Sequence, residues 1–324
     1  MKKPGSMLAA VALLVAVLGA GGIWRGWAGG GPLTHDTAFV VPDGANLNAI
    51  SVKLQQAGAI WSARAFRFHA RLFAHTGKSV KAGEFLLPAG ASESQILKIL
   101  EGNMALRRFV TIPEGMPSVE VGARIDAAPF LTGHIGDPAE GSVMPETYDY
   151  RPGESRGAVL ARMQAAMSRT LDEAWDGRAA GLPVKTKAQA LVLASIVEKE
   201  TGKPSELPMV AGLYENRLRQ GIMLQADPTI IYPITKGRPL GRRILQSEIH
   251  ARNDWNTYAM TGLPKSPITN PGKASILAVL HPAPTDALYM VADGTGGHAF
   301  AATLEAHNRN VAKWFAIRRA RGDL

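Results

Sequence analysis

The sequence predicts an α+β protein with an N-terminal transmembrane helix and a mixed α/β second half. Three observations support this fold class. The chain begins with an uncharged apolar segment, its first half repeats a Pro-x-Gly turn between apolar stretches, and its second half contains long helical patterns and a glycine hairpin. At 324 residues, the chain is long enough for two domains behind a membrane tether.

The N-terminal segment is expected to be an uncleaved membrane anchor over residues 1–27. Two lysines precede Met7–Trp24, eighteen residues without a charge, which is near the short limit of about 17–25 for a membrane-spanning helix. A cleaved signal peptide is the competing interpretation, because the most hydrophobic part ends at Leu18. We favour the anchor because Trp24 and Trp27 are typical of an interfacial aromatic belt. Under either interpretation the rest of the chain is exported.

A repeated motif follows a glycine-rich neck, residues 28–35, which we expect to be flexible. Three segments each join an apolar strand end to a Pro-x-Gly turn and then to two apolar residues four apart, which share one helix face. The three turns are Val41-Pro-Asp-Gly44, Leu87-Pro-Ala-Gly90 and Ile112-Pro-Glu-Gly115. We therefore predict three strand-turn-helix units, with an extra helix over 63–74 after the first.

The second half is expected to mix helices with loops and one hairpin. Apolar spacing predicts helices over 157–174, 187–200, 207–220 and 304–319, the last amphipathic. The glycine-rich run Leu288–Phe300 predicts a β-hairpin. Residues 221–241 are predicted to be strand and loop, because proline and glycine are frequent there.

The predicted helix 187–200 carries the most informative side chains. Between Ala190 and Val197 only Ser195 is polar, and Glu198 and Glu200 follow. Burial can raise a Glu pKa from about 4.3 towards about 6, which suits a general acid near neutral pH. A helix turns about 100° per residue, so the two carboxylates point to nearly opposite faces and only one can enter a given cleft. Helix geometry does not choose between them.

Composition and motifs exclude several other chemistries. The chain has no cysteine, and its eight histidines show no metal-binding spacing. The net charge of +9 is dispersed and no aromatic-basic motif accompanies it, so nucleic acid is not an expected partner. Gly153-Glu-Ser-Arg-Gly157 has the letters of a hydrolase elbow, but no apolar strand precedes it, so we interpret it as the turn before a helix.

What remains is carboxylate chemistry beside polar loops. Amides, hydroxyls and aromatic faces on loops held by proline and glycine are suited to binding sugars. The same residues also serve in ordinary turns and caps. These loops are Glu140–Tyr148, Gln225–Thr229 and Asp254–Gly272.

The ordered motifs together resemble the endolytic murein transglycosylases, the MltG/YceG-like family. The resemblance extends from the anchor to the last helix. The motifs are Ala194-Ser-Ile-Val-Glu-Lys-Glu-Thr201, Asn216-Arg-Leu218, Leu224-Gln-Ala-Asp-Pro-Thr229, Tyr258-Ala-Met-Thr-Gly-Leu-Pro264, Asn270-Pro-Gly272, His281-Pro282 and Val291-Ala-Asp-Gly-Thr-Gly-Gly-His-Ala-Phe300.

The resemblance implies a domain plan and a catalytic residue. Residues 36–108 would form a LysM-like subdomain and 109–324 a YceG-like catalytic domain with a lysozyme-like acid/base site. In the family the acid/base is the second Glu of Glu-Lys-Glu, which here is Glu200. One departure is Glu146, where the family often has Asp between Pro and Thr, which puts a direct ligand role for this residue in doubt.

The resemblance also implies a mechanism and a location. Glu200 would cleave the bond between N-acetylmuramic acid and N-acetylglucosamine to give 1,6-anhydro ends, with no metal or organic cofactor. Subsite or support roles are expected for Gln225, Asp227, Thr229, Asn256 and Tyr258. The protein would be single-pass in the inner membrane with its catalytic domain in the periplasm. Its partners would be the membrane and nascent glycan strands, with peptidoglycan synthases as candidates.

Two other functions stay open on the sequence alone. One is a non-catalytic tether that binds peptidoglycan through the LysM-like region. The other is a hydrolytic muramidase that uses Asp227 or Asp254 as a second carboxylate. The cleavage product separates the three.

Overall fold

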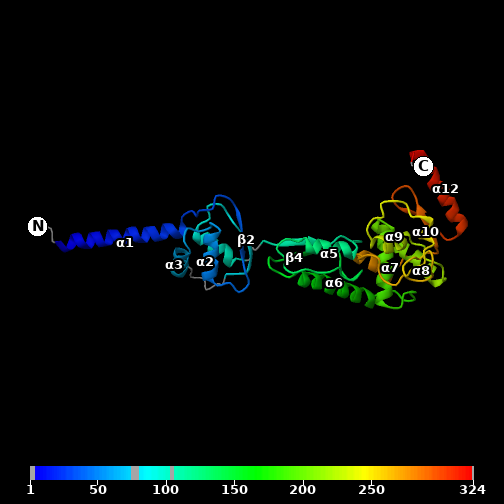
Figure 1. The fold of residues 1–324 in the computed structure, drawn as a ribbon, viewed down its shortest axis with the longest axis horizontal. Coiled ribbons are helices and arrows are strands. Elements are labelled where there is room, and N and C mark those ends of the chain that lie inside the picture. The colour runs from blue at the N-terminus through cyan, green and yellow to red at the C-terminus, as the bar shows by residue number, and fades with distance from the viewer. Residues whose placement is uncertain (1–3, 74–79, 103–105, 323–324) are drawn as a thin grey trace. The chain divides into compact units, whose positions relative to one another are not determined.

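The structure, a computed structural model, describes residues 4–73, 80–102 and 106–322. Contacts divide the chain into two compact units (Figure 1). Unit 1 comprises residues 1–108 and 149–153, and unit 2 comprises 109–148 and 154–324. The fold is a mixed α+β fold, as predicted. The assignment of segments to an anchor, a neck, a LysM-like subdomain and a catalytic domain stays a prediction.

The N-terminal helix α1 (Pro4–Ala28) contains an 18-residue stretch, Val11–Ala28, long and apolar enough to cross a membrane. Only 6% of this stretch is buried within the protein. No other helix in the described residues meets the same criteria of length and composition. The predicted N-terminal apolar helix is therefore present, and its side chains from Val11 to Gly22 face outward into the surroundings.

Unit 1 is built on a two-stranded antiparallel sheet in which Thr37 lies opposite Leu87 and Val41 opposite Gly83. Asn46 accepts a hydrogen bond from the backbone at the start of helix α2, and Ser92 does so at the start of helix α4. Apolar side chains of the sheet and helices form one core with Trp27. The elements are β1 (Thr37–Val41), α2 (Leu47–Gln56), α3 (Ala63–Phe73), β2 (Gly83–Leu87) and α4 (Glu93–Glu101).

The glycine-rich segment after α1 is attached to unit 1. The backbone N–H of Gly31 donates to the carbonyl of Gly90 (3.1 Å), and the N–H of Gly90 donates to the carbonyl of Leu33 (2.8 Å). A Cβ at Gly31 would clash with the carbonyl of Ala91, so glycine is required for this close approach. These contacts attach part of the segment 28–35 to unit 1, while the flexible neck stays a prediction.

The third predicted strand-turn-helix unit is also present. It consists of β3 (Arg108–Thr111) and α5 (Ser118–Asp126). The strand β3 pairs with β4 (Thr147–Tyr150) in a second two-stranded sheet. All three Pro-x-Gly motifs therefore join a strand to a helix, and Gly44, Gly90 and Gly115 adopt the positive φ that this turn needs.

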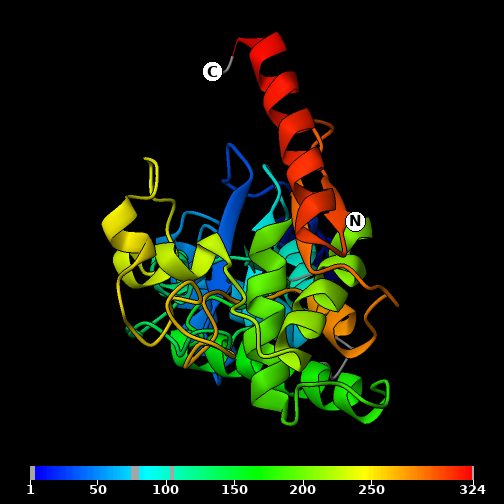
Figure 2. The same ribbon diagram turned by 90° about the vertical axis from the view of Figure 1, so that its right-hand side faces the viewer.

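Unit 2 is mainly helical, with one terminal hairpin. Helix α7 packs against α6, α8, α9 and α11, and its apolar side chains lie at the centre of the core. The elements are α6 (Arg156–Asp176), α7 (Lys187–Glu200), the 3₁₀ turn η1 (Pro204–Glu206), α8 (Leu207–Arg219), α9 (Asp227–Thr235), α10 (Gln246–Ile249), α11 (Lys273–Leu280), β5 (Tyr289–Ala292), β6 (His298–Ala301) and α12 (Leu304–Arg321). Figure 2 shows α12, in red, extending past the green helices of this unit.

Most of the predicted elements of unit 2 are observed, but three of its α-helices, α9, α10 and α11, were missed, and so was strand β4. Ser155 caps α6, which confirms the interpretation of the Gly-x-Ser-x-Gly letters as the turn before a helix. The strand-and-loop prediction for 221–241 was wrong, because 227–235 form α9. Pro228 stands in its first turn, where a missing N–H costs nothing. Helices α10 and α11 are too short for apolar periodicity to reveal them. The last helix is present, but none of its residues is buried.

Candidate active site

Helix α7 presents its last residue to the site because its body is fixed in the core. Thr186 caps its start by accepting a hydrogen bond from the N–H of Gln189 (3.1 Å). The hydroxyl of Ser195 donates to the carbonyl of Val192 (2.7 Å) and accepts from the N–H of Ile268 (3.0 Å). The one polar residue of the apolar run therefore fastens a polar loop to the helix.

The two carboxylates at the end of α7 have different surroundings. Glu198 accepts hydrogen bonds from the N–H of Gly272 (2.9 Å) and the hydroxyl of Ser275 (2.6 Å), at the start of α11. Glu200 lines a cavity of about 430 Å³, and Glu198 does not. The opposite faces expected from helix geometry are therefore observed.

The cavity is formed by α7, α8, the segment 224–231, Tyr258 and the terminal hairpin. Its apolar lining comes from Leu213, Leu224, Ile231 and Met290. Many of its other lining residues can donate or accept hydrogen bonds. These polar residues are Lys199, Glu200, Tyr214, Arg217, Gln225, Asp227, Tyr258 and His298.

The carboxyl group of Glu200 is held in its protonated form. Burial raises its pKa to about 8, and the negative charge of Asp227 adds to this rise. A hydrogen bond from the Tyr214 hydroxyl and the charge of Arg217 act in the opposite direction. Its Oε1 atom is buried without a hydrogen-bond partner among the described residues. A protonated carboxyl that lines a cavity and has one oxygen without a partner can donate its proton to a bound molecule.

Two of the predicted support residues meet each other in the cavity. The phenol of Tyr258 donates a hydrogen bond to Oδ1 of Asp227 (2.7 Å). Burial raises the pKa of Tyr258, and its bond to Asp227 raises it further. Gln225 also lines the cavity, with a φ of 54°, a value that strains a residue other than glycine. Glu200, Gln225, Asp227 and Tyr258 therefore share one site.

Thr229 and Asn256 lie outside the cavity lining and fix the backbone beside it. Thr229 is fully buried, and its hydroxyl donates to the carbonyl of Ala226 (2.6 Å). Asn256 is also fully buried; its amide donates to three carbonyls at the end of α10, and its Oδ1 accepts from the N–H of Tyr258 (2.9 Å). Their geometry fits the support role rather than direct contact.

Sequence reasoning did not single out Arg217, which organises one wall of the cavity. This buried side chain donates to the carbonyl of Leu288 (2.6 Å) from Nε. Its Nη1 donates to the carbonyls of Met223 (2.9 Å) and Leu224 (3.0 Å) and to Oε1 of Gln225 (3.0 Å). It therefore joins the hairpin to the loop that carries Gln225. Its only signal in the sequence was its place in Asn216-Arg-Leu218.

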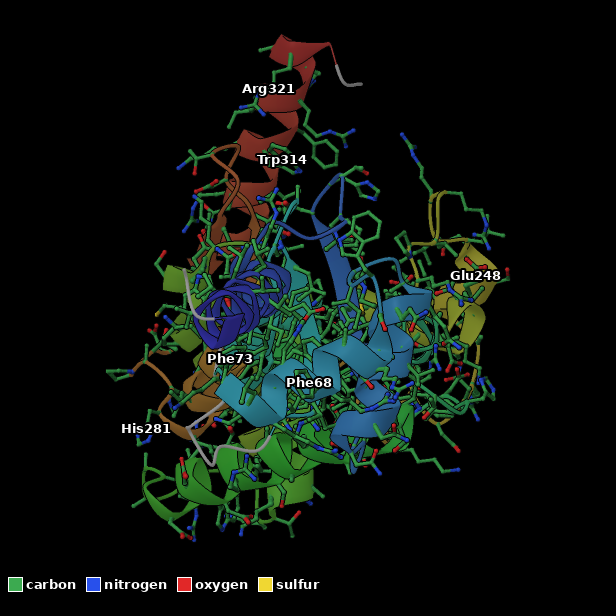
Figure 3. All side chains as sticks on the ribbon, turned by 90° about the vertical axis from the view of Figure 1, so that its left-hand side faces the viewer. Phe68, Phe73, Glu248, His281, Trp314 and Arg321 are labelled. Atoms are coloured by element: carbon green, nitrogen blue, oxygen red, sulfur yellow. The ribbon has the colours of Figure 1, made fainter. Side chains whose placement is uncertain are left out.

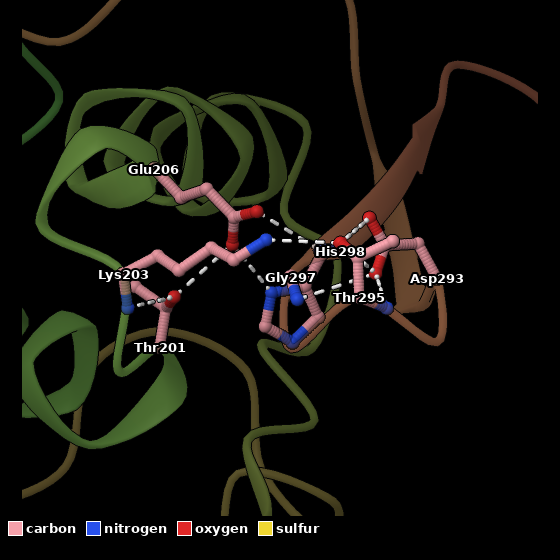
Figure 4. Close-up of polar contacts among 7 residues, drawn as sticks. All are labelled: Thr201, Lys203, Glu206, Asp293, Thr295, Gly297 and His298. Atoms are coloured by element: carbon pink, nitrogen blue, oxygen red, sulfur yellow. Dashed lines mark hydrogen bonds and ion pairs between the residues drawn. The ribbon is translucent and has the colours of Figure 1, made fainter.

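A second cluster that the sequence did not reveal connects the end of α7 to the terminal hairpin (Figure 4). Glu206 accepts hydrogen bonds from the hydroxyl of Thr201 (3.0 Å) and from the backbone N–H of His298 (3.0 Å). Its Oε2 also lies 2.8 Å from Nδ1 of His298. A Cβ at Gly297 would clash with Oε1 of Glu206, so glycine permits this approach. In the tautomer that donates from Nδ1 to Glu206, Nε2 of the ring is an acceptor.

Other residues discussed from the sequence lie apart from the cavity. Asp254 forms an exposed ion pair with Lys265 (2.9 Å). Glu146 is exposed and does not line the cavity, while its backbone carbonyl accepts from the N–H of Ile112 (2.9 Å). Within the described ranges, no group of three or more histidine or acidic side chains could hold a metal ion.

Comparison with known proteins connects this site to a family. An endolytic murein transglycosylase of Bacillus subtilis (strain 168) is 25% identical over 308 residues, which cover 85% of this chain and 84% of that protein. A protein of the same name from Streptococcus pneumoniae (strain D39) is 26% identical over 323 residues, covering 84% of this chain and 57% of that protein.

The fold has a counterpart among solved structures. A crystal structure of a YceG-like protein from Listeria monocytogenes matches with a TM-score of 0.54 and 24% identity, covering 85% of this chain and 98% of that one. A family model described as the YceG-like family matches residues 39–313. Because this match takes in both compact units and the whole cavity, the chain belongs to the YceG-like family.

Proposed function

We propose that this protein is an endolytic murein transglycosylase with Glu200 as its acid/base residue. It cleaves the bond between N-acetylmuramic acid and N-acetylglucosamine within nascent glycan strands. Membership of the YceG-like family and the names of two relatives support the substrate class. The observation that carries the residue assignment is the raised pKa of Glu200, about 8, at the wall of a polar cavity.

The reaction needs one group that first gives and then takes a proton. Protonated Glu200 donates its proton to the glycosidic oxygen as the bond from that oxygen to C1 of the muramoyl residue breaks. The resulting carboxylate takes the proton of the muramoyl C6 hydroxyl, whose oxygen bonds to C1. The products are a free hydroxyl on N-acetylglucosamine and a 1,6-anhydro end. Glu200 ends protonated, and water is not consumed.

The other side chains of the cavity fit supporting roles. The carboxylate of Asp227 is suited to stabilise positive charge that develops at C1. Tyr258 holds Asp227 in place, and Gln225 and Nε2 of His298 offer polar contacts to sugar hydroxyl groups. No metal or organic cofactor enters the mechanism.

A hydrolytic muramidase is the alternative that one observation favours. Asp227 lines the same cavity as Glu200, so a second carboxylate is available as a nucleophile. The other candidate, Asp254, is engaged with Lys265 and does not line the cavity. A non-catalytic peptidoglycan tether would leave the high pKa of Glu200 without a purpose.

We also propose where the protein acts in the cell envelope. The apolar stretch of α1 anchors the chain once in the inner membrane, with residues 109–324 in the periplasm, where glycan strands are made. Unit 1 would act as a LysM-like module beside the membrane. Peptidoglycan synthases, which supply nascent strands, are the candidate protein partners.

The test compares Glu200→Gln with Glu198→Gln in the full chain in detergent. Both variants replace a carboxylate of α7, but only Glu200 lines the cavity. Incubation with uncrosslinked glycan strands, followed by mass spectrometry, should show shorter strands with 1,6-anhydro ends for the wild type and Glu198→Gln. Glu200→Gln should be slower by about 10²–10⁴, the usual contribution of general acid–base catalysis. Reducing ends would indicate a hydrolase, and intact strands in every sample would indicate a tether.

A further inference from the structure

Helix α3 carries an exposed apolar face that the proposed reaction does not use. Its inner face, formed by Ala63, Phe66, His69 and Ala70, is buried in the core of unit 1. On the outer face Phe68 is 53% exposed and Leu72 is 48% exposed. These two residues are four apart, so they lie together on one side of the helix.

The end of α3 contacts α1 at the point where α1 leaves its apolar stretch. The ring of Phe73 stacks on Trp27 with centroids 5.7 Å apart and meets Trp24 edge-on at 5.8 Å. A Cβ at Gly26 would lie 2.8 Å from Cε1 of His69, so the two helices approach closely. Figure 3, which views the side from which α1 projects, labels Phe68 and Phe73 on α3.

This contact fixes the depth of α3 relative to a bilayer that α1 spans. The candidate span ends at Ala28, and Trp24 stands four residues before that end. At 1.5 Å per residue, Trp24 lies about 6 Å before the end of the candidate span, near the bilayer surface where Trp side chains are enriched. The C-terminal turn of α3, which touches Trp24, therefore reaches the same level.

The charges of this face match an anionic membrane surface. Arg64 and Arg71 flank Phe68 on the outer side of α3, and both are exposed. Neither arginine has a hydrogen bond or ion pair to the described residues, whereas Arg67 donates to the hydroxyl of Ser51 (2.8 Å). No Asp or Glu occurs in α1 or α3.

We propose that the outer face of α3 (Arg64, Phe68, Arg71 and Leu72) binds the surface of the bilayer beside α1. Phe68 and Leu72 enter the boundary between headgroups and acyl chains, and the two arginines bind phosphate groups of anionic phospholipid. This inference rests on the proposed function only in requiring that α1 spans the membrane. The protein then has two attachments to the membrane, which hold unit 1 against the bilayer.

The experiment uses the absence of cysteine from the chain. Leu72→Cys and Leu86→Cys each create a unique site for an environment-sensitive fluorophore on the full chain. Leu86 is a matched control because it is also a leucine of unit 1, is 44% exposed, and lies on β2 rather than on the outer face of α3. Each labelled protein is reconstituted into phosphatidylcholine vesicles with and without phosphatidylglycerol, some containing a lipid-attached quencher.

The expected result is a blue shift and severalfold stronger quenching at position 72 than at position 86. The difference should increase with phosphatidylglycerol and decrease when Arg64→Glu and Arg71→Glu are added. Equal, water-like emission at both positions would overturn the inference, as would a response at position 72 to added glycan strands instead of lipid. Carbonate extraction separates the two proposals: protein that resists extraction but shows no lipid contact at position 72 contradicts this inference alone. Protein that is extracted contradicts the anchor as well.

Discussion

Glu206 binds both the backbone N–H and the imidazole ring of His298, at 3.0 Å and 2.8 Å. The same carboxylate accepts a hydrogen bond from Thr201, which directly follows Glu200. His298 lines the cavity, so one carboxylate fixes the position of two of its walls relative to each other. The catalytic proposal depends on this connection, because an acid/base residue acts only on a substrate held within hydrogen-bond reach.

We expect Glu206→Gln to weaken the attachment of the hairpin to α7. The loss of charge-assisted hydrogen bonds should cost about 1–2 kcal/mol of unfolding free energy and lower the rate of strand cleavage. Thermal unfolding and strand-cleavage assays of the full chain in detergent measure both effects. Glu305→Gln, in an exposed ion pair on α12, is the control and should change neither.

Acid should also weaken the attachment of the hairpin to the end of α7. Burial opposes ionisation of Glu206, but its hydrogen bonds from His298 and Thr201 outweigh burial and hold its pKa below the usual value. Its stabilising contribution is therefore present above about pH 4.5 and is lost as the pH falls below that value. If Glu206→Gln unfolds at the same temperature as wild type at neutral pH, the carboxylate does not support the hairpin.

Glu200→Gln should stabilise the protein at neutral pH although it slows cleavage. The pKa of Glu200 is about 8 in the folded protein and about 4.5 when unfolded. The folded state therefore holds the extra proton between these values, so stability falls as the pH rises from 4.5 to 8. The cost near pH 7 is on the order of 2–3 kcal/mol, which the uncharged amide avoids.

Unfolding temperatures of wild type and Glu200→Gln from pH 4 to pH 9 test this prediction. Burial also raises the pKa of Glu215 to about 7, which adds a similar trend to both proteins. The difference between the two curves therefore isolates Glu200. It should grow from near zero in acid to a plateau above pH 8, and parallel curves would mean that Glu200 titrates as an ordinary carboxyl.

Asp227→Asn should move the alkaline limit of activity to lower pH. Cleavage requires protonated Glu200, so the rate of the wild type is expected to fall above about pH 8. Burial is the larger cause of that high pKa, and the charge of Asp227 is the second. Without this charge the pKa of Glu200 falls, whereas the asparagine oxygen can still accept the bond from Tyr258.

The measurement is the initial rate of formation of 1,6-anhydro ends against pH. Asp254→Asn is the matched control, because its ion pair with Lys265 is exposed and outside the cavity. Its alkaline limit should match that of the wild type. If the alkaline limit of Asp227→Asn equals that of the wild type, the charge of Asp227 does not contribute to the high pKa of Glu200.

Arg217→Lys should destabilise the cavity wall despite keeping the charge. A lysine cannot reproduce the fork that reaches Leu288, Met223 and Leu224 at once. Carbonyl groups left unpaired in the core should cost about 2–4 kcal/mol. Unfolding of the full chain measures the loss, and cleavage should also decline because Gln225 loses its partner. Arg219 is half-exposed beside Glu215, so Arg219→Lys should lower the unfolding free energy much less. Equal losses of unfolding free energy in the two variants would show that the guanidinium contacts of Arg217 do not cause the destabilisation.

Local sequence patterns predicted elements whose apolar residues repeat without interruption. Helix α7 has the predicted bounds, 187–200, because its apolar run is followed by three charged residues, Glu198-Lys199-Glu200. The three strand-turn-helix units and the terminal hairpin were also found, since glycine and proline mark their turns. Helix α9 was missed because Pro228 and Pro233 suggested a loop, although the first stands where a helix tolerates it.

The residues that line the cavity together with Glu200 could not be predicted from patterns along the chain. Tyr214 and Arg217 come from α8 and His298 from the terminal hairpin, and no pattern along the chain places these two elements beside Glu200 in one cavity. Asp227 and Tyr258 were selected from polar loops, but their 2.7 Å hydrogen bond depends on how these loops fold together. Such contacts are long-range, and single-sequence patterns report only neighbours along the chain.

Patterns along the chain were sufficient to predict an apolar N-terminal helix, three strand-turn-helix units and a buried helix that ends in two carboxylates. The geometry of that helix placed Glu198 and Glu200 on opposite faces but did not show which of them enters a cavity. That depends on the segments that pack against each face in the folded protein. The start of α11 binds Glu198, whereas Glu200 lines the cavity formed by α8, α9 and the hairpin. The reason is physical: a carboxyl acquires a pKa of about 8 from the burial and charge that surround it, and other segments of the chain supply both.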